Sequence, residues 1–326
     1  MTFSIITPLY NKAPFVTRTL ESVFAQTYAD WELIIMDDGS TDDSLAVARE
    51  CVEKNGASGR VHIYTQTNAG VAAARNHAVE HAQGDYLCFL DADDWWKPSF
   101  LEQMAQLIQL YPDAGLYATN YVYYKTHKTH IALDIPTGYI QYAQAYLNSA
   151  AMPIWTGTVA MPRHVFDEMG GFPVGVCLGE DFLLWAKTAM HYPVVFLNTP
   201  LAYYNNDVPA TLRATRNLYA PEHSMLFLLD TIASENTLSA DWKRLFDKLR
   251  VSGLMEYWLD SNYHDRAKTE LAKVDWSQQS RSAKRLYHIP VPLLRLYYAT
   301  IRMASCCKQS FYSYICKKRV YGKSNH

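Results

Sequence analysis

The chain has 326 residues, 49% of them hydrophobic, so it is long enough to bury one large core and a smaller appendage. Its formal net charge of -2 gives no general reason to expect a nucleic-acid-binding protein. The six cysteines show no zinc-type spacing, no basic leader precedes the first strand-like segment, and no apolar stretch approaches the roughly 20 residues of a membrane span. We therefore expect a reduced, cytoplasmic protein.

The first hundred residues alternate between short apolar runs and amphipathic stretches. The apolar runs predict strands at 3–6, 32–36, 61–64 and 86–90. The stretches between them predict helices at about 15–24, 41–52 and 71–81, and a further helix that starts at Pro98. Strands that alternate with helices in this way are typical of a parallel, doubly wound sheet in an α/β protein.

The pattern is less regular after about residue 115. Leu116–Tyr124 and Val194–Leu197 predict strands added to the sheet, and Pro162–Met169 predicts a helix closed by two glycines. From about Leu218 the sequence is typical of helices. We therefore predict two domains, a sheet-containing domain over 1–215 and a helical C-terminal extension over 216–326.

Polar residues follow three of the predicted strands, where a simple connection would not require them. These segments are Thr7-Pro8-Leu9-Tyr10-Asn11, Asp37-Asp38-Gly39-Ser40 and Asp91-Ala92-Asp93-Asp94. Ligands of doubly wound sheets bind beyond the carboxyl ends of the strands, so we expect the three segments to form one site. Asp91 and Asp93 stand one residue apart, and two such carboxylates can face a hard cation that neutralises a diphosphate.

Asp38 has two interpretations that the residues alone leave even. Its carboxylate is an acceptor for the imide N–H of uracil, and Gly39 lets the backbone approach a ligand closely. The segment Asp37-Asp38-Gly39-Ser40 can equally be a turn that caps the next helix.

Arg75 lies about one turn into the Ala-rich helix that follows Asn68-Ala69-Gly70. On a helix of small residues, its guanidinium could reach a phosphate or orient an aspartate. A solvated surface charge explains Arg75 at least as well when the other motifs are set aside.

Glu180 and Asp181 precede an apolar helix that starts at Phe182. Acidic residues at a helix N-terminus are favoured by the helix dipole, so capping is one explanation. The other is general-base catalysis, because a sugar hydroxyl is a poor nucleophile until a carboxylate removes its proton.

Taken together and in order, these segments resemble the inverting family 2 glycosyltransferases of the GT-A fold. The likeness covers roughly residues 1 to 205 and rests on the combination, because each segment alone is a weak signal. The segment from Trp155 to Phe172 also resembles the acceptor side of this family. The resemblance implies a doubly wound, mainly parallel but mixed sheet with helices on both faces.

The resemblance also implies roles for the matching residues. Tyr10 would stack on uracil, Asp38 would accept its N–H, Arg75 would support the diphosphate or the metal aspartates, and Asp93 would bind Mn²⁺ or Mg²⁺. Asp181 would be the base, with Glu180 beside it as an orienting group. The complete donor site would comprise Thr7, Pro8, Tyr10, Asn11, Asp38, Asn68, Gly70, Arg75, Asp91 and Ala92. The acceptor site would comprise Trp155, Thr158 and Trp185.

One departure from the family concerns the segment after Leu201-Ala202-Tyr203-Tyr204. Many relatives place there an Arg or His that helps to neutralise the diphosphate, whereas this chain continues with Asn205-Asn206-Asp207. Either Arg213 or Arg216 takes over the task, or the metal carries it alone.

The implied function is metal-dependent, inverting transfer of a sugar from a UDP-sugar to a saccharide or lipid-linked saccharide in bacterial surface polysaccharide synthesis. One alternative is a haloacid-dehalogenase-type phosphatase that uses Asp91 and Asp93. Such enzymes normally carry Thr or Val where Trp95 stands here, and their motif tends to begin the domain. The other alternative is a non-catalytic, metal-dependent sugar-binding module.

The C-terminal tail is strongly basic. From Trp276 onward there is no Asp or Glu, and ten of the 30 basic residues lie there, which leaves 20 basic against 32 acidic residues in the body. Apolar residues from Ile289 are interleaved with Arg295 and Arg302, and Lys317-Lys318-Arg319 follow. The tail therefore suits either peripheral binding to an anionic membrane surface, on the inner face of the cell membrane, or packing on the acidic body.

Overall fold

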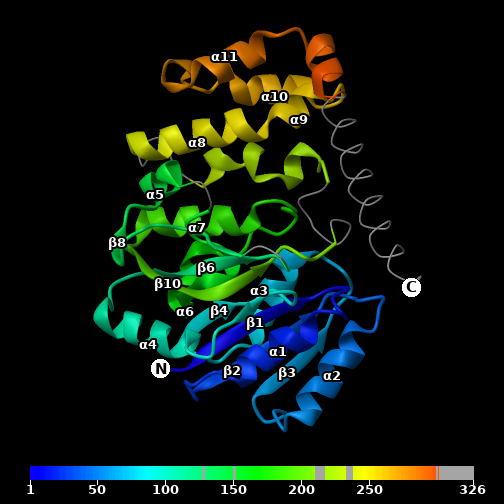
Figure 1. Cartoon of the computed structure of the whole chain (residues 1–326), viewed down its shortest axis with the longest axis vertical. Coiled ribbons are helices and arrows are strands. Elements are labelled where there is room, and N and C mark those ends of the chain that lie inside the picture. The colour runs from blue at the N-terminus through cyan, green and yellow to red at the C-terminus, as the bar shows by residue number, and fades with distance from the viewer. Residues whose placement is uncertain (127–128, 150–151, 210–216, 233–237, 299, 301–326) are drawn as a thin grey trace, which may run out of the picture. The chain divides into compact units, whose positions relative to one another are not determined.

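The computed structural model describes residues 1–126, 129–149, 152–209, 217–232, 238–298 and 300 (Figure 1). These residues belong to two compact units, Met1–Phe246 and a second unit that begins at Asp247. The domain boundary predicted after residue 215 stays a prediction, and the two compact units divide at a later position, after Phe246.

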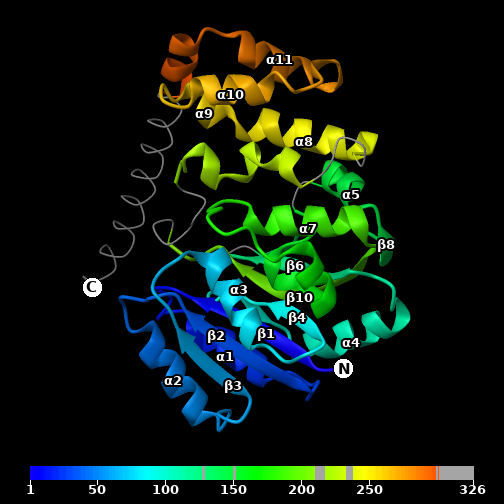
Figure 2. The same ribbon diagram turned by 180° about the vertical axis from the view of Figure 1, so that it is seen from behind.

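Four parallel strands form the first half of the sheet, in the order β3-β2-β1-β4. They are β1 Phe3–Leu9, β2 Trp31–Asp37, β3 Val61–Thr65 and β4 Tyr86–Phe89. The helices that connect them are α1 Val16–Phe24, α2 Ser44–Lys54 and α3 Val71–His81. Since the chain returns across β2 and β1 to reach β4, right-handed crossovers place α3 on the face opposite α1 and α2 (Figures 1 and 2).

The second half of the sheet is mixed. It contains β9 Val159–Pro162, antiparallel to both β4 and β6 Leu116–Tyr124, then β10 Val194–Asn205 and the edge strand β5 Trp95–Trp96. Two short strands pair with β6 and β10, namely β7 His130–Ile131 and β8 Gly138–Ile140. The helices of this half are α4 Phe100–Leu110, α5 Tyr142–Asn148, α6 Arg163–Met169 and α7 Glu180–His191. The predicted doubly wound, mainly parallel but mixed sheet is confirmed.

The prediction of helix from Leu218 onward is wrong for the first segment it covers. Three short 3₁₀ turns lie there, at Pro221–His223, Met225–Phe227 and Leu229–Thr231. Backbone bonds to another segment compete with the helix, because Met225 N–H donates to the Leu178 carbonyl and Leu178 N–H to the His223 carbonyl. Pro221 also lacks the N–H that a helix interior needs.

The second unit is helical, as predicted for the C-terminal extension. Helix α8 Ala240–Gly253 leads into it, and α9 Met255–Leu259, α10 His264–Leu271 and α11 Arg281–His288 follow. Within it, the buried Arg250 of α8 pairs with Glu270 of α10 at 3.1 Å. Across the described ranges, no helix is long and apolar enough to cross a membrane. The predicted tail residues from Arg302 to Arg319 lie outside the described residues.

Candidate active site

The loops after β1 and β2 are fastened together by Asn11. Its backbone has φ +50°, and its side-chain oxygen accepts the N–H groups of Thr41 at 2.8 Å and Asp42 at 3.3 Å. Its own N–H donates to the Ser40 hydroxyl at 3.1 Å. The Asn11 side chain thus holds these two loops together. The neighbouring Tyr10 is 45% exposed and presents a ring face on which an aromatic base can stack.

Asp38 organises the loop that follows β3. Its buried carboxylate accepts the N–H groups of Ala69 at 2.8 Å and Gly70 at 2.9 Å, and the side-chain amide of Gln66 at 2.7 Å. Asn68 donates its own amide to the Asp38 carbonyl at 2.9 Å. The Asp38 carboxylate therefore holds the loop around residues 66–70 in place through these hydrogen bonds. It does not cap the next helix and is not exposed to solvent.

Glycine is required at position 39 for two reasons. Its φ is +71°, in the left-handed region, and a Cβ there would lie 3.1 Å from the Asn68 backbone nitrogen. The two strand-end loops can approach this closely only without a side chain at Gly39.

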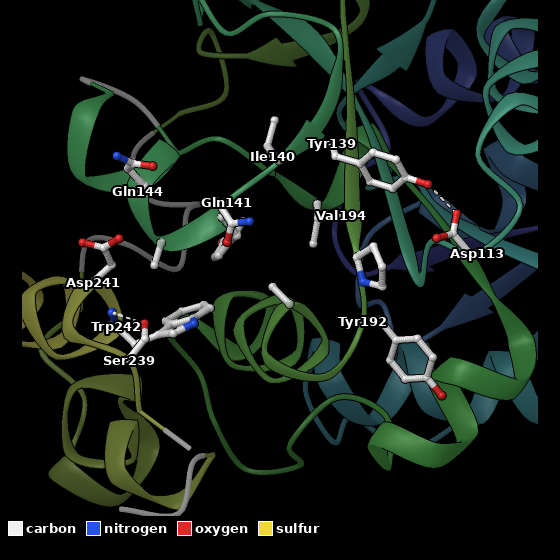
Figure 3. A pocket seen from close by; sticks show the side chains of 14 residues that line it. Asp113, Tyr139, Ile140, Gln141, Gln144, Tyr192, Val194, Ser239, Asp241 and Trp242 are labelled. Atoms are coloured by element: carbon white, nitrogen blue, oxygen red, sulfur yellow. Dashed lines mark hydrogen bonds between the residues drawn. The ribbon is translucent and has the colours of Figure 1, made fainter. Parts of the chain in front are cut away.

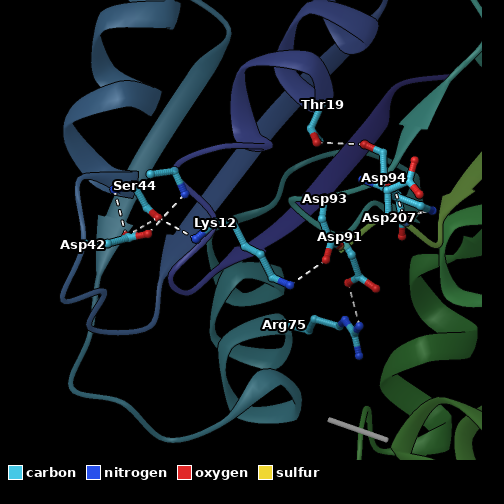
Figure 4. Close-up of polar contacts among 11 residues, drawn as sticks. Lys12, Thr19, Asp42, Ser44, Arg75, Asp91, Asp93, Asp94 and Asp207 are labelled. Atoms are coloured by element: carbon cyan, nitrogen blue, oxygen red, sulfur yellow. Dashed lines mark hydrogen bonds and ion pairs between the residues drawn. The ribbon is translucent and has the colours of Figure 1, made fainter. Parts of the chain in front are cut away.

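The acidic segment after β4 faces two cations from different elements (Figure 4). The Asp93 carboxylate contacts the Lys12 ammonium at 2.5 Å, and the Asp91 carboxylate contacts Arg75 at 2.7 Å. Burial raises the pKa of Asp93, while Lys12 opposes that rise. The three strand ends therefore meet in one site, as their sequence predicts.

Arg75 bridges the two sides of this site. It comes from α3, is only 3% exposed, and contacts Glu180 of α7 at 2.9 Å as well as Asp91. Its guanidinium also lies 5.0 Å from the centre of the Phe172 ring. Although burial opposes its charge, Asp91 and Glu180 raise the pKa of Arg75. Arg75 is therefore a buried, permanently charged link, and the surface-charge interpretation is wrong.

Glu180 and Asp181 begin α7, as predicted, but their surroundings differ. Glu180 is held by Arg75, whereas Asp181 accepts the Thr156 hydroxyl at 2.9 Å and the Phe182 N–H at 2.7 Å. Burial raises the pKa of both carboxyl groups, and Arg75 opposes the rise in each. Asp181 forms no ion pair with the described residues, so its oxygens remain the better placed to accept a proton.

The side chains of several predicted contact residues are buried inside the protein. Trp185 is 0% exposed and packs against Phe89 and Phe172, with ring centres 5.8 and 5.6 Å away, so it cannot stack on a saccharide. The Thr158 hydroxyl lies inside and donates to the Trp155 carbonyl at 2.7 Å. Buried side chains that support the site from within are those of Thr7, Pro8, Ala92 and Trp155.

A divalent cation fits the charges of this site. Among the described residues, no three His, Cys, Asp or Glu side chains form a metal site by themselves. The carboxylates of Asp91 and Asp93 nevertheless supply the oxygen ligands that Mg²⁺ and Mn²⁺ prefer. Proteins often bind Mg²⁺ through one or two carboxylates together with the phosphates of a substrate. Counting Glu180 and Asp181 as well, four carboxylates share Lys12 and Arg75 as their cations among the described residues, so this part of the site carries an excess of negative charge when all are ionised.

The end of β10 is tied to the same acidic segment. The buried Asp94 carboxylate accepts the Asn205 N–H at 2.7 Å, and the Asp94 carbonyl accepts the Thr19 hydroxyl at 2.7 Å. Asn205 thus meets the site through its backbone and adds no positive charge. The two arginines predicted as substitutes, Arg213 and Arg216, lie outside the described residues.

Three residues of the site escaped the sequence analysis. Lys12 is adjacent to a recognised segment, Gln66 stands just before another, and Thr156 lies between two predicted acceptor residues. Thr156 stands in the segment from Trp155 to Phe172 that resembles the acceptor side of the family, and the hydroxyls of Thr156 and Thr158 bond to different partners.

Removal of the Arg75 charge should destabilise the folded protein. We expect Arg75→Met to lower the free energy of unfolding by about 3 kcal/mol, because Asp91 and Glu180 would lose their buried cation. Adding Glu180→Gln should restore part of that loss. Urea unfolding measures both, with Arg18→Met as the control, since that arginine is exposed and lies over the Trp95 ring. An equal loss in Arg75→Met and Arg18→Met would contradict the bridging role.

The sequence model of the family described as glycosyl transferase family 2 matches residues 4–170, just over half of the chain. The putative teichuronic acid biosynthesis glycosyltransferase TuaG of Bacillus subtilis is 42% identical over 106 residues, which is 32% of this chain and 41% of TuaG. Glycosyltransferase GlyA of Streptococcus pneumoniae is 34% identical over 214 residues, 62% of this chain and 30% of GlyA. The matches thus span less than half of each of these relatives.

Solved structures show the same fold at low identity. The S. aureus TarS fragment 1–349 in complex with UDP has a TM-score of 0.66 and 18% identity, over 84% of this chain and 80% of that one. The Pyrobaculum calidifontis mannosyltransferase PcManGT, in complex with GDP-Man and Mn²⁺, has a TM-score of 0.55 and 20% identity, over 99% and 88% of the two chains. With the family match, the three strand-end segments and this fold in agreement, the chain belongs to glycosyl transferase family 2.

Proposed function

We propose that the protein transfers a sugar from a UDP-sugar to a hydroxyl group of a saccharide, with inversion at the anomeric carbon. The observation that carries the proposal is the bridge through Arg75, which holds the acidic end of β4 beside the two carboxylates at the start of α7. A donor-binding end and a candidate base therefore belong to one rigid arrangement. The base is Asp181, and Glu180 is fixed beside it by Arg75.

The donor side is proposed from the residues at the strand ends. Tyr10 offers a face to the base, and Asp38 keeps an acceptor oxygen within the loop that it organises. TarS structures in complex with UDP and with UDP-GlcNAc support a nucleotide-sugar donor in this fold, and the PcManGT complex with Mn²⁺ supports a cation. Asp93, with Asp91 beside it, would hold Mn²⁺ or Mg²⁺, and the bound cation would offset the charge of the leaving diphosphate.

The acceptor side is proposed from Asp181 and its partners. Asp181 would take the proton of the acceptor hydroxyl as the new glycosidic bond forms, and the nucleotide diphosphate would leave from the opposite face of the sugar. Attack from that side inverts the anomeric carbon. Thr156 orients Asp181 through its hydroxyl, which leaves the second lone pair of that oxygen for the substrate.

The acceptor is proposed to belong to a bacterial surface polysaccharide, in a saccharide or lipid-linked form. Support comes from TuaG, whose description names teichuronic acid biosynthesis.

The phosphatase alternative is set aside, because the chain belongs to glycosyl transferase family 2 and its would-be nucleophile, Asp91, is paired with Arg75. The non-catalytic sugar-binding alternative predicts retained donor binding without transfer, and the next experiment separates the two.

Two substitutions should separate donor binding from transfer. Asp93→Ala should abolish the Mn²⁺-dependent part of UDP binding, because a cation ligand is lost. Asp181→Asn should leave UDP binding intact and abolish sugar transfer, because the amide accepts no proton under these conditions. Calorimetry with UDP and Mn²⁺ measures the first effect, and transfer from a panel of UDP-sugars measures the second. Undiminished transfer in Asp181→Asn would remove the base assignment.

The pH dependence of transfer should report the surroundings of Asp181. Burial raises its pKa, and the Thr156 hydroxyl opposes this by stabilising the charged form. The base acts when deprotonated, so the rate should rise with pH and reach half its plateau above the ordinary aspartate pKa of about 3.9. Thr156→Val should move this midpoint upward by about one pH unit, because a hydrogen bond to a charged group is lost.

The neighbouring threonine provides the control for that profile. Thr158→Val removes a hydroxyl that bonds to the Trp155 backbone and not to Asp181. Its kcat/KM profile should keep the wild-type midpoint. Equal midpoints in all three proteins would show that Asp181 is not the group that titrates.

The basic tail is proposed to bind an anionic membrane surface. In the second unit, Leu293, Leu296 and Tyr297 are exposed beside Arg295, and α11 carries further basic residues. Apolar side chains next to positive charges match the boundary between acyl chains and anionic headgroups.

Sedimentation with vesicles tests the membrane proposal. Replacement of Leu293, Leu296 and Tyr297 by Ser should reduce binding to vesicles that contain anionic lipid, because less apolar surface is buried. Leu110→Ser is the control, since Leu110 is exposed in the first unit. Equal sedimentation of the triple variant and the control would contradict the proposal.

A further inference from the structure

A chain of side-chain hydrogen bonds links the Asp38 carboxylate to helix α3. Gln66 donates its side-chain amide to Oδ1 of Asp38 at 2.7 Å, and the Gln66 side-chain oxygen lies 2.8 Å from Nδ1 of His77. His77 is half-buried on α3, whereas Asp38 directly follows β2. A helix on one face of the sheet therefore reaches the carboxylate at a strand end through one glutamine.

The carboxylate fixes the direction of each hydrogen bond in this chain. An ionised carboxylate only accepts, so Gln66 turns its amide N–H toward Asp38 and its carbonyl oxygen toward His77. Because that carbonyl oxygen is an acceptor, Nδ1 of His77 has to carry a proton and donate it. His77 is thus the donor at the start of the chain.

The two oxygens of Asp38 are used unequally. Oδ1 accepts two hydrogen bonds, from the Gln66 amide and from the Ala69 N–H at 2.8 Å, whereas Oδ2 accepts the Gly70 N–H at 2.9 Å. Each carboxylate oxygen offers about two acceptor positions. The protein therefore fills Oδ1, and the position that is left lies on Oδ2.

The backbone holds Gln66 in place but does not decide which way its amide faces. The Gln66 N–H donates to the Asp37 carbonyl at 2.9 Å, which keeps the residue beside Asp38. If the amide were turned over, its carbonyl oxygen would face Oδ1 and its N–H groups would face the N–H of His77. The turned amide is excluded at both ends, and the exclusion at the far end depends on His77.

A second histidine on α3 makes a different contact. The His81 ring stacks on the Tyr64 ring of β3, with centres 3.9 Å apart and planes 9° apart, and its centre lies 5.2 Å from that of His77. His81 is half-buried as well. It matches His77 in residue type, helix and exposure, but it packs on Tyr64 instead of orienting Gln66.

We propose that His77 is a positioning residue for recognition of the donor base. By orienting Gln66, it keeps Oδ1 of Asp38 occupied and leaves Oδ2 to accept a ring N–H. The inference rests on the proposed UDP-sugar donor and concerns how its base is chosen. Uracil carries an N–H at ring position N3, whereas cytosine carries a lone pair there that would face the carboxylate. The chain from His77 to Asp38 therefore makes the protein favour UDP over CDP.

Calorimetry of the full-length protein with UDP and with CDP, both in the presence of Mn²⁺, tests this inference. The wild-type protein should bind UDP about tenfold more tightly than CDP, as expected for one hydrogen bond to a charged acceptor. His77→Asp places acceptors where Nδ1 stood and turns the Gln66 amide over, so the preference should fall about fivefold. His77→Asn keeps an N–H at the position of Nδ1 and should keep the preference.

The ratio of the two Kd values separates recognition from stability. Both values come from the same protein sample, so a loss of folded protein lowers the stoichiometry of binding and leaves the ratio unchanged. The control for the charge change is His81→Asp, which removes the stacking on Tyr64 and should keep the wild-type ratio.

A second variant tests the middle of the chain. Gln66→Leu removes the amide that joins His77 to Asp38 and should lower the preference for UDP as His77→Asp does. Its control is Gln144→Leu, in an exposed glutamine that lines a cavity of about 440 Å³ in the first unit (Figure 3). That cavity lies at the amino-terminal ends of β6 and β10, away from the strand ends that carry Asp38.

The outcomes separate the role of His77 from the transferase. Equal preference in the wild type, His77→Asp and Gln66→Leu, in a protein that transfers sugar, would overturn the role of His77 and keep the transferase. A fall as large in His77→Asn or His81→Asp would overturn it too. A fall confined to His77→Asp and Gln66→Leu, in a protein that transfers no sugar, would support the role and remove the transferase. A wild-type protein that binds neither nucleotide would overturn this inference together with the UDP-sugar donor.

Discussion

A guanidinium that is only 3% exposed needs carboxylates around it, and Arg75 finds one on each side of the site. Asp91 stands at the end of β4 and Glu180 at the start of α7, so a single charge spans two elements that are 89 positions apart in the chain. The small residues of α3, including the buried Ala72 and Ala74, allow the helix to pack closely enough for this reach. Breaking the bridge would leave charges without partners at both ends, so the bridge holds the end of β4 beside the start of α7.

Excess negative charge is the second constraint, and it follows from the first. Arg75 is shared between two carboxylates and Lys12 contacts a third, yet Asp181 and the buried Asp94 lie close by. Burial and the charges of Asp93 and Asp91 raise the pKa of Asp94 well above its ordinary value. Such a charge balance fits the divalent cation proposed above, which would in turn offset a diphosphate that these carboxylates otherwise repel.

Local sequence predicted the parts of the fold that depend on local pattern. Alternating apolar runs predicted the four parallel strands, and acidic residues marked the ends of β2 and β4. The antiparallel β9 was missed, because Val159–Pro162 is a four-residue run whose place between β4 and β6 depends on distant pairing. Trp185 was misplaced for a similar reason: an aromatic side chain near an acidic motif suits a sugar site and a core equally, and only packing decides.

The buried contacts of Asp38 also bear on the choice of nucleotide. Gln66, Ala69 and Gly70 occupy three of the hydrogen-bonding positions of its carboxylate. A nucleotide base would therefore have to donate to the remaining acceptor position on Oδ2. A carboxylate accepts but does not donate, and uracil and guanine both present a ring N–H to such an acceptor. Solved structures of this fold hold UDP in one case and GDP-Man in another. Charge alone at Asp38 therefore cannot separate the two bases, so a choice between them would have to come from the shape of the proposed base site.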